Sequence, residues 1–378
     1  MDASLLTSSA FWLGSTLVAA EEFPGALPEC ASLCGHVLFG TSGSTGAPKW
    51  IALSKSALLA SAVAVNRHLE VTETSCWGLA LPSRHVGGFG VGARAFAAGC
   101  AWCALGGRWD APAFVNWLGA RRVSHTSLVP TQVHDLVSMH LRAPASLRAI
   151  VVGGGHLDAA TGQRARALGW PVLASYGMTE AASQIATQRL EDLETIYQPE
   201  PLSLLPIWEA TSTSPEHLLR IAGPALFSGW VARNGGQWEF VARETSWYDT
   251  QDRVKVIDGS LIVVGRADTL IKVLGELVDP EAIERELVVL SGGRLQPSGV
   301  VVVAVPDARA GHILVPVFEA AVDGSVIQEA LRDYAGRARG PHRLGSPVML
   351  ESFALSAVGK PLRGQITAAV IAQVSGCH

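Results

Sequence analysis

The sequence lacks any run of Lys or Arg residues and has little charge altogether. Charged residues make up 16% of the chain, and 29 basic residues against 33 acidic ones give a net charge of −4. A protein that follows a nucleic-acid backbone needs clustered cations to replace its counterions. We therefore expect no nucleic acid among the partners of this protein.

Long apolar runs are also missing. The apolar stretch over residues 1–20 is interrupted by Ser, Thr and Gly, and it contains no Lys or Arg. A membrane span needs about 20 predominantly apolar residues, and a secretory leader begins with a basic segment. The sequence therefore predicts no stable membrane insertion and favours a cytoplasmic location.

Cysteine is scarce, with six residues in 378, which argues against a disulfide scaffold. The pairs Cys30/Cys34 and Cys100/Cys103 could in principle offer four thiolates to zinc. Both pairs lie among apolar residues, and this favours buried, unreactive thiols over a metal site.

What the chain does have is enough apolar content for a large core. Hydrophobic residues make up 48% of the 378, and the length exceeds the roughly 250–300 residues at which single cores stop growing. We expect two domains, residues 1–267 and 268–378. The predicted fold class is α/β, with a large layered α/β N-terminal domain that includes a small β subdomain, followed by a smaller α+β C-terminal domain.

The alternation of strand and helix patterns supports this fold class. Apolar runs that end in Gly, Ser or Thr predict buried parallel strands, and capped periodic segments predict helices. The strands are expected at 36–39, 147–152 and 171–174, and the helices at 55–69, 111–120, 131–139 and 159–168. From about residue 208, strand-like runs around Asp258-Gly259 predict the antiparallel subdomain. In the C-terminal domain we expect strands at 300–305 and 314–319 and helices at 280–289 and 326–339.

The most informative segment is residues 39–49, Phe-Gly-Thr-Ser-Gly-Ser-Thr-Gly-Ala-Pro-Lys. Its three glycines and four hydroxyl residues follow a predicted strand and precede a predicted helix. Backbone N–H groups and hydroxyls can therefore surround an anion while Lys49 adds positive charge, which predicts a phosphate loop. It is not a Walker loop, because Pro48 precedes the lysine and Trp50 stands where Ser or Thr would hold magnesium.

A second glycine-rich segment has another explanation. Residues 88–93, Gly-Phe-Gly-Val-Gly-Ala, fit a loose dinucleotide-binding pattern, with Asp110 about twenty residues further on. However, Pro82 and Arg84 interrupt the strand that such a site needs. Helix packing is the favoured explanation of these glycines.

Residues 41–49 resemble the phosphate loop of the adenylate-forming superfamily, which comprises acyl-CoA ligases, luciferases and the adenylation domains of peptide synthetases. Further segments resemble that family's motifs and follow in its order. They are 153–157 (Gly-Gly-Gly-His-Leu) and 175–180 (Ser-Tyr-Gly-Met-Thr-Glu) on the adenine side, 248–252 (Tyr-Asp-Thr-Gln-Asp) for the ribose, 265–275 for the hinge and the loop after it, and 358–360 (Val-Gly-Lys) for the C-terminal lysine. The resemblance spans residues 39–363 and implies an AMP-forming enzyme that uses ATP and Mg²⁺.

The resemblance implies a role for each matching residue. Tyr176 would stack on adenine, Asp252 would accept hydrogen bonds from the ribose hydroxyls, and Arg266 would lie against the ribose and the α-phosphate. Glu180 would bind magnesium. Lys360 would neutralise charge on the α-phosphate and the attacking carboxylate. The implied nucleotide-binding residues are Thr41, Ser42, Gly43, Ser44, Thr45, Gly46, Lys49, Gly154, Gly155, His156, Ser175, Tyr176, Gly177, Met178, Thr179, Asp252 and Arg266.

Residues 81–88 and 123–132 resemble acyl-pocket segments of the o-succinylbenzoate–CoA ligases of menaquinone synthesis. The implied substrate contacts are Arg84, His85, Ser127 and Thr131, with His125 and Gln132 nearby. His85 would lie near the acyl carbonyl where the CoA thiol arrives. From the residues alone, His85 could equally be a satisfied core histidine. An ordinary surface arginine is the favoured interpretation of Arg84, ahead of an anchor for a second substrate carboxylate.

The implied activity is that of an ATP-dependent acid–CoA ligase with Lys360, His85 and Glu180 as catalytic residues. A carboxylate attacks ATP to give acyl-AMP and pyrophosphate, and CoA then displaces AMP. Between the two halves the mobile C-terminal domain would rotate about Asp268 and exchange Lys360 for the loop from Lys272 to Gly275. The implied acid is 2-succinylbenzoate. The alternatives are another aryl or medium-chain acid, a carrier-protein acceptor, or a catalytically silent nucleotide-binding protein, and a homo-oligomer is compatible with all of them.

The chain also departs from the family's pattern. Trp50 and Gln251 replace glycines of the family, which predicts reshaped loops at both positions. The phosphate loop begins as early as Thr41, whereas family members carry a much longer segment ahead of it. We therefore expect a missing or shortened N-terminal subdomain.

Overall fold

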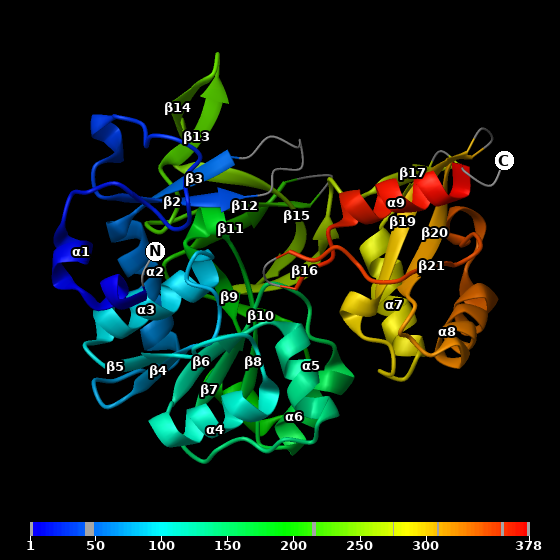
Figure 1. The fold of residues 1–378 in the computed structure, drawn as a ribbon, viewed down its shortest axis with the longest axis horizontal. Coiled ribbons are helices and arrows are strands. Elements are labelled where there is room, and N and C mark those ends of the chain that lie inside the picture. The colour runs from blue at the N-terminus through cyan, green and yellow to red at the C-terminus, as the bar shows by residue number, and fades with distance from the viewer. Residues whose placement is uncertain are drawn as a thin grey trace. The chain divides into compact units, whose positions relative to one another are not determined.

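The computed structural model describes residues 3–41, 49–213, 217–274, 276–307, 310–356 and 359–375. They fall into two compact units (Figure 1). The N-terminal unit comprises residues 1–250 and 255–263, and the C-terminal unit comprises residues 251–254 and 264–378. Asp252 and Arg266 therefore pack with the C-terminal unit, although the motif pattern predicts a boundary between 267 and 268.

Five parallel strands form one half of the main sheet of the N-terminal unit, in the order β8-β7-β6-β4-β5. A helix follows each of the first four strands in the chain, as parallel connections require. β7 is buried over its whole length, as expected of a central parallel strand. The strands are β4 (Cys76–Leu79), β5 (Ala101–Ala104), β6 (His125–Leu128), β7 (Ala149–Val152) and β8 (Val172–Met178), and the helices are α3 (Val86–Ala98), α4 (Ala111–Arg121), α5 (Pro130–Ser138) and α6 (Ala159–Ala167). The α/β alternation predicted for this region is confirmed.

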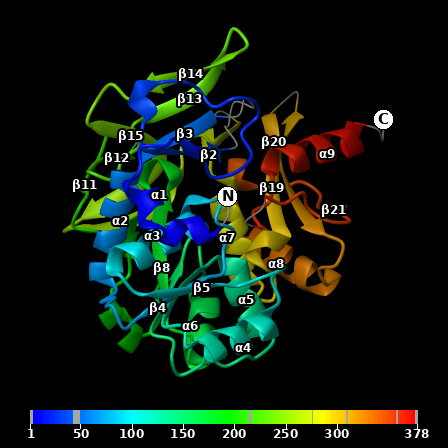
Figure 2. The same cartoon turned by 60° about the vertical axis from the view of Figure 1, so that its left-hand side comes forward.

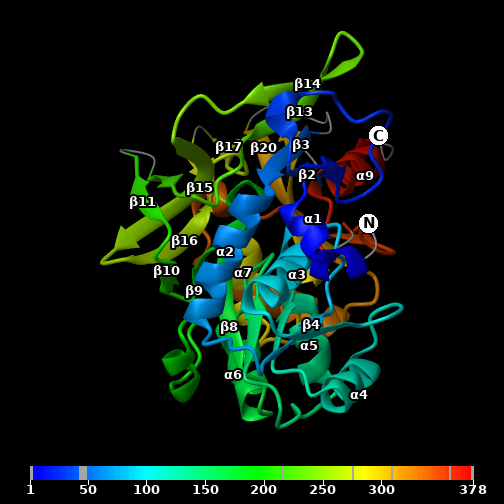
Figure 3. The same cartoon turned by 90° about the vertical axis from the view of Figure 1, so that its left-hand side faces the viewer.

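The second glycine-rich segment lies inside α3, which packs beside α2 (Lys55–His68) (Figure 3). A Cβ atom on Gly92 would lie 2.5 Å from the Cβ atom of Leu6, so the glycine allows a close approach. The segment is not a turn between a strand and a helix. Helix packing is therefore the correct explanation, and the dinucleotide pattern is a coincidence.

The same sheet continues past β8 with antiparallel pairing. β9 pairs with β8, and the order from there is β9-β10-β16-β15-β12-β11. The predicted β subdomain is thus an extension of the main sheet. Asp258 and Gly259 have positive φ angles of 45° and 74°, as a type I′ turn requires. The strands are β9 (Ser183–Thr187), β10 (Leu202–Leu204), β11 (Glu209–Ser212), β12 (Leu218–Ala222), β15 (Trp247–Ile257) and β16 (Ser260–Arg266).

A separate five-stranded sheet carries the ends of the phosphate loop. Its strands, in sheet order, are β1 (Val18–Ala19), β2 (His36–Thr41), β3 (Lys49–Ser54), β13 (Gly229–Asn234) and β14 (Gln237–Ala242). β2 pairs antiparallel with β3 along its whole length. The prediction of a loop that leads from a strand into a helix is therefore wrong, because residues 49–54 return as a strand. α2 begins after Ser54, whose hydroxyl accepts a hydrogen bond from the Ala57 N–H at 3.1 Å.

Trp50, which replaces a glycine of the family, is a core residue of this second sheet. Its side chain is 5% exposed, and its ring centroid lies 4.8 Å from that of Phe23. Phe23 in turn lies 5.0 Å from Trp238 of β14. The tryptophan thus belongs to an aromatic cluster that ties the segment before β2 to the β13–β14 hairpin.

The C-terminal unit contains a three-stranded sheet with an apolar core on each face (Figure 2). Along β19, Val300 and Val302 pack with α7 and α8, while Val301 and Val303 pack with α9. This alternation follows from the two-residue period of a strand. The elements are β17 (Ile271–Val273), β18 (Glu276–Val278), β19 (Val300–Asp307), β20 (Gly311–Glu319), β21 (Val348–Leu350), α7 (Pro280–Leu290), α8 (Gly324–Arg337) and α9 (Arg363–Ser375). The predicted strands and helices of this region are confirmed.

The remaining elements are short. They are α1 (Ser9–Leu13) and the 3₁₀ turns Ala3–Thr7, Ala31–Leu33, Thr179–Ala181, Leu190–Glu194, Pro297–Gly299 and Gly340–His342. In the part of the chain that the structure describes, every helix is too short or too polar to cross a membrane.

The cysteines differ from the prediction. Cys30, Cys34, Cys100 and Cys103 are free thiols that are half-buried or exposed, not buried. Within the described ranges there is no group of three or more His, Cys, Asp or Glu side chains that could hold a metal ion.

Candidate nucleotide- and acyl-binding site

The core of the predicted phosphate loop, which includes Ser42, Gly43, Ser44, Thr45 and Gly46, lies outside the described residues. Its two flanks are described. Thr41 and Lys49 face each other across β2 and β3, and the Thr41 hydroxyl donates to the Lys49 carbonyl at 3.1 Å. The Lys49 ammonium lies 5.8 Å from the ring centroid of Trp230. The two flanks of the loop are therefore paired strands, and the ammonium of Lys49 lies beside an aromatic ring.

The two predicted adenine segments lie next to each other. Gly154, Gly155 and His156 follow β7, and the segment from Ser175 through Tyr176 and Gly177 to Met178 ends β8, the parallel neighbour of β7. In α/β sheets, ligands bind beyond the carboxyl ends of the parallel strands. A side chain at Gly177 would collide with the Ser183 carbonyl of β9, which explains why glycine is needed there. The fold thus brings these segments to one edge, as a nucleotide site needs.

Glu180 lies at the same edge, in the 3₁₀ turn Thr179–Ala181 that follows β8. Its backbone carbonyl accepts a hydrogen bond from the Phe227 N–H at 2.8 Å, which fixes the turn. One carboxylate suits Mg²⁺, because phosphate oxygens and waters usually complete its octahedral shell. The residue therefore fits the magnesium-binding role that its motif implies.

His85 occupies the N-cap position of α3 and is half-buried. Its Nε2 atom is buried, and no described residue hydrogen-bonds to it. Desolvation and the neighbouring Arg84 lower the pKa of this histidine below its ordinary value, so the imidazole is neutral near pH 7. Arg84 itself is exposed on the turn before the helix, in agreement with a surface arginine.

Ser127 is buried on β6, and its hydroxyl accepts a hydrogen bond from Arg94 Nη1 at 3.1 Å. Thr131 is half-buried in the first turn of α5. The other two expected pocket residues are structural instead. His125 is fully buried between the Ser124 hydroxyl and the Leu69 carbonyl. The side-chain oxygen of Gln132 accepts a hydrogen bond from the Val129 N–H at 3.0 Å and caps α5.

Arg94 is a candidate site residue that the sequence analysis missed. Its side chain is 2% exposed, and its guanidinium reaches the hydroxyls of Ser127 and Ser183 at 3.1 and 3.4 Å. It also lies 5.2 Å from the ring centroid of Trp77, while its Nε is buried without a hydrogen-bond partner in the described chain. Desolvation lowers its pKa to about 10. The only signal in the sequence is an arginine in the otherwise apolar run Phe-Gly-Val-Gly-Ala-Arg-Ala-Phe.

No carboxylate in the described part of the chain forms an ion pair with Arg94. Burying a cation without a counter-ion costs several kcal/mol. Two neutral hydroxyls offset only part of that cost. A buried guanidinium without a counter-ion is thus suited to bind an anionic group.

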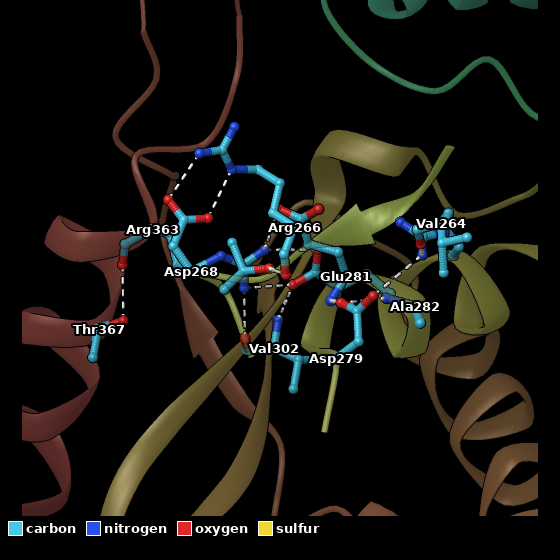
Figure 4. A network of polar contacts seen from close by, with 12 residues as sticks. Val264, Arg266, Asp268, Asp279, Glu281, Ala282, Val302, Arg363 and Thr367 are labelled. Atoms are coloured by element: carbon cyan, nitrogen blue, oxygen red, sulfur yellow. Dashed lines mark hydrogen bonds and ion pairs between the residues drawn. The ribbon is translucent and has the colours of Figure 1, made fainter. Parts of the chain in front are cut away.

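In the C-terminal unit, Arg266 joins the ribose motif to the hinge motif. Its guanidinium contacts Asp252 Oδ1 at 2.9 Å and forms a fork with the two oxygens of Asp268, both at 2.8 Å (Figure 4). The hydrogen bonds to Asp268 raise the pKa of the arginine further, against desolvation. Asp252 is 6% exposed. In this structure Arg266 binds the carboxylate that is expected to accept hydrogen bonds from the ribose hydroxyls. Gln251 lies within β15 without a positive φ angle, so no glycine is required there. Its carbonyl accepts a hydrogen bond from the Ala267 N–H at 2.8 Å.

Lys272 is exposed on β17, opposite Leu277 of β18, and Gly275 falls outside the described residues. Lys360 also belongs to the C-terminal unit and lies in the loop before α9. Surrounding protein desolvates its ammonium group and lowers its pKa, while Glu281 opposes the shift. The side chain as a whole keeps contact with solvent.

Comparison with known proteins shows what the chain is similar to. The model of the AMP-binding enzyme family matches residues 36–205. The 2-succinylbenzoate–CoA ligase of Escherichia coli is 33% identical over 314 residues, which are 82% of this chain and 64% of that protein. The ligase of the same name from Enterococcus faecalis is 28% identical over 85% of this chain and 66% of its own length. The chain thus spans less than two thirds of these curated relatives.

Solved structures of MenE enzymes are similar to this chain in fold. An arginine-to-lysine variant of E. coli MenE with bound OSB-AMS is 26% identical, covers 93% of this chain and 72% of its own, and superposes with a TM-score of 0.70. Bacillus subtilis MenE in complex with OSB-AMP covers 87% of this chain and 68% of its own at 24% identity and a TM-score of 0.73, which supports the fold. The chain thus contains a segment, residues 36–205, that belongs to the AMP-binding enzyme family. Within that family it is similar to the 2-succinylbenzoate–CoA ligases, and the predicted fold class is confirmed.

Proposed function

We propose that this protein is an ATP-dependent acid–CoA ligase whose substrate is 2-succinylbenzoate. The observation that carries the proposal is the buried guanidinium of Arg94, which has no carboxylate partner among the residues described. A dicarboxylate can place one carboxylate at the reaction centre and pair the other with this cation, so that a fork of charge-assisted hydrogen bonds offsets the desolvation. The similarity to 2-succinylbenzoate–CoA ligases supports the same acid.

In the first half-reaction the substrate carboxylate attacks the α-phosphorus of ATP, and pyrophosphate leaves. The segments after β7 and within β8 would hold the adenine, with Tyr176 stacked on the ring. Asp252 would accept the ribose hydroxyls. Lys360 would stabilise the negative charge that develops on the α-phosphate. Glu180 would hold Mg²⁺, which when bound neutralises charge on the leaving pyrophosphate.

In the second half-reaction the CoA sulfur attacks the acyl carbonyl, and AMP leaves. The neutral imidazole of His85 can accept a hydrogen bond or a proton from the arriving thiol, because its buried Nε2 has no partner in the described chain. We assign the exchange of Lys360 for the Lys272 loop to a rotation about Asp268. The fork between Arg266 and Asp268 fixes the carboxylate of the pivot residue.

The test is a carboxylate-dependent exchange of labelled pyrophosphate into ATP, followed by thioester assays with CoA. We expect 2-succinylbenzoate to exceed benzoate and octanoate by a factor of at least roughly a hundred in kcat/KM. Equal turnover of octanoate or benzoate would replace this assignment by a general acyl-CoA ligase. Exchange without thioester formation on CoA would indicate a carrier-protein acceptor, and the absence of exchange with every acid would indicate a silent nucleotide-binding protein.

ATP and CoA are supplied in the cytoplasm, which supports a cytoplasmic location for the proposed reaction. A homo-oligomer stays a prediction that light scattering can check.

A further inference from the structure

Lys360 is joined to Ser356 by two hydrogen bonds. The Ser356 N–H donates to the Lys360 carbonyl at 2.7 Å, and the Lys360 N–H donates to the Ser356 hydroxyl at 3.1 Å. Leu355 and Pro361 flank these bonds as an isolated antiparallel bridge. Before this segment, the Phe353 N–H donates to the Glu319 carboxylate of β20 at 2.8 Å and ties the chain to the sheet of the C-terminal unit.

After Lys360, the tie to the sheet comes three residues later, at the first residue of α9. Arg363 forms a fork with the carboxylate of Glu284 on α7, with N–O distances of 2.7 and 2.9 Å. It also donates to the Val302 carbonyl of β19 at 2.6 Å (Figure 4). The Val302 N–H in turn donates to the Glu284 carboxylate at 2.6 Å. One guanidinium thus connects the start of α9 to β19 of the sheet and to α7, which packs on the other face of the sheet.

The pair contributes more to position than to stability. The side chains of Glu284 and Arg363 are 14% and 29% exposed, and desolvation raises the pKa of Glu284 although Arg363 and the Val302 N–H oppose the shift. A buried ion pair gains little over apolar side chains of the same size, because both charges lose their water. α9 already has apolar anchors, since Ile366 and Val370 pack in the core with β19 and β20. Apolar contacts tolerate small shifts along the helix axis, whereas a two-bond fork has one geometry.

The charges around Lys360 belong to the same network. Glu281, on the first turn of α7, is the strongest of the carboxylates that attract the Lys360 ammonium. The same carboxylate lies 3.9 Å from Arg363. Asp252 attracts the lysine as well, and Arg266 repels it. Any displacement of α9 relative to α7 therefore changes both the place of the lysine and its surroundings.

We propose that Glu284 and Arg363 are a positioning pair that fixes Lys360 for adenylate formation. This inference rests on the proposed function. Neither residue touches the substrates; the pair acts through the loop. Because Lys360 serves only the first half-reaction in that mechanism, loss of the pair slows acyl-AMP formation and spares the transfer to CoA.

The main test replaces both residues in the full-length protein, Glu284→Met with Arg363→Met. The melting temperature should stay within about 4 °C of the wild type, because apolar replacement of a buried pair is often neutral or stabilising. Pyrophosphate exchange should fall by a factor of roughly 10–100, the usual effect of displacing a catalytic group by about 1 Å. Thioester formation from supplied acyl-AMP should change by less than about threefold.

A matched control removes another ion pair of the same unit. Arg294 contacts Glu329 at 2.6 Å, and both side chains are half-exposed. Arg294→Met with Glu329→Met should leave both half-reactions unchanged. If the buried double variant fails to fold, Arg363→Lys keeps the charge without the fork and is expected to show the same selective loss in a milder form.

A second readout does not depend on activity. The rate at which acetic anhydride modifies Lys360, followed by peptide mass spectrometry and referred to Lys272, should change at least about threefold in the buried double variant and stay constant in the control. If the wild type shows no exchange with any acid, the proposed function fails. The labelling rates still show whether Glu284 and Arg363 position Lys360. Equal losses in both half-reactions, or unchanged exchange and labelling, would overturn the positioning role.

Discussion

The guanidinium of Arg94 and the hydroxyl of Ser127 are joined by a hydrogen bond of 3.1 Å in the interior of the N-terminal unit. A serine hydroxyl is neutral, so this contact satisfies one N–H group without balancing the charge. Serine at this point leaves the arginine without a permanent counter-ion, whereas an aspartate would supply one. The relationship explains how a fully buried arginine can serve recognition.

The first prediction compares two arginines. Arg94→Met should lower kcat/KM for 2-succinylbenzoate by roughly a hundredfold, because the second carboxylate loses its charged partner. Benzoate, which has one carboxylate, should be affected far less. Arg84→Met is the control, since Arg84 is exposed. A selective loss in the Arg84 variant and none in the Arg94 variant would exchange their roles.

The second prediction separates the two half-reactions. Lys360→Ala should slow pyrophosphate exchange by roughly two or more powers of ten, because the charge on the α-phosphate loses its cation. Transfer from supplied acyl-AMP to CoA should stay close to the wild-type rate. Lys272→Ala should instead slow the transfer to CoA and leave pyrophosphate exchange close to the wild-type rate. Parallel losses in both variants would contradict the alternation of the two loops.

The third prediction concerns stability against acid. Desolvation lowers the pKa of His125 to about 4, below its ordinary value of about 6.5. The unfolded chain therefore binds the proton more readily between these values, and stability is lost as the pH falls from about 6.5 to about 4. The protonation of this residue alone should lower the free energy of unfolding at pH 5 by about 2 kcal/mol.

Urea titrations at pH 7 and pH 5 measure this loss. His125→Gln should be less stable at pH 7 but should lose about 2 kcal/mol less than the wild type on acidification. His312→Gln, at an exposed backbone-bonded histidine, should follow the wild type. If the His125→Gln variant lost as much unfolding free energy on acidification as the wild type, the acid sensitivity would come from other groups.

The fourth prediction concerns the aromatic cluster. Trp50→Gly restores the residue typical of the family and should cost about 3–5 kcal/mol of unfolding free energy, because a buried ring is lost. Phe23→Ala should destabilise less in the Trp50→Gly background than in the wild type, since the two rings contact each other. Strict additivity in a double-mutant cycle would show that the rings stabilise the fold independently.

Local signals explain what could be predicted from the sequence. α2 and α6 begin behind Ser54 and Asp158, whose side chains accept hydrogen bonds from backbone N–H groups three residues on. A cap and its periodic helix are neighbours in the chain, so both are visible in the sequence. Each nucleotide motif is also a short continuous segment, so it is visible in the sequence. The fold brings the segment after β7 and the end of β8 to the same end of the sheet, as expected.

Long-range pairing explains what could not be predicted. The histidine His125 resembles a pocket residue until the Leu69 carbonyl, 56 residues away in the chain, is seen to be its partner. The return of residues 49–54 as β3 depends on pairing with both β2 and β13. The role of Arg94 depends on the absence of a nearby carboxylate in the described chain, which no local pattern records.

The division of the chain into units has a practical consequence for protein engineering. The C-terminal unit is discontinuous, since residues 251–254 belong to it while the β15–β16 turn region at 255–263 belongs to the N-terminal unit. A fragment that begins at residue 268 would leave Asp252 and Arg266 behind, and Arg266 is the residue that forms the fork with Asp268. Chimeras that graft this unit from one ligase onto another therefore need three junctions, at 250/251, 254/255 and 263/264, and a single splice point would sever the network that surrounds the exchanged lysine.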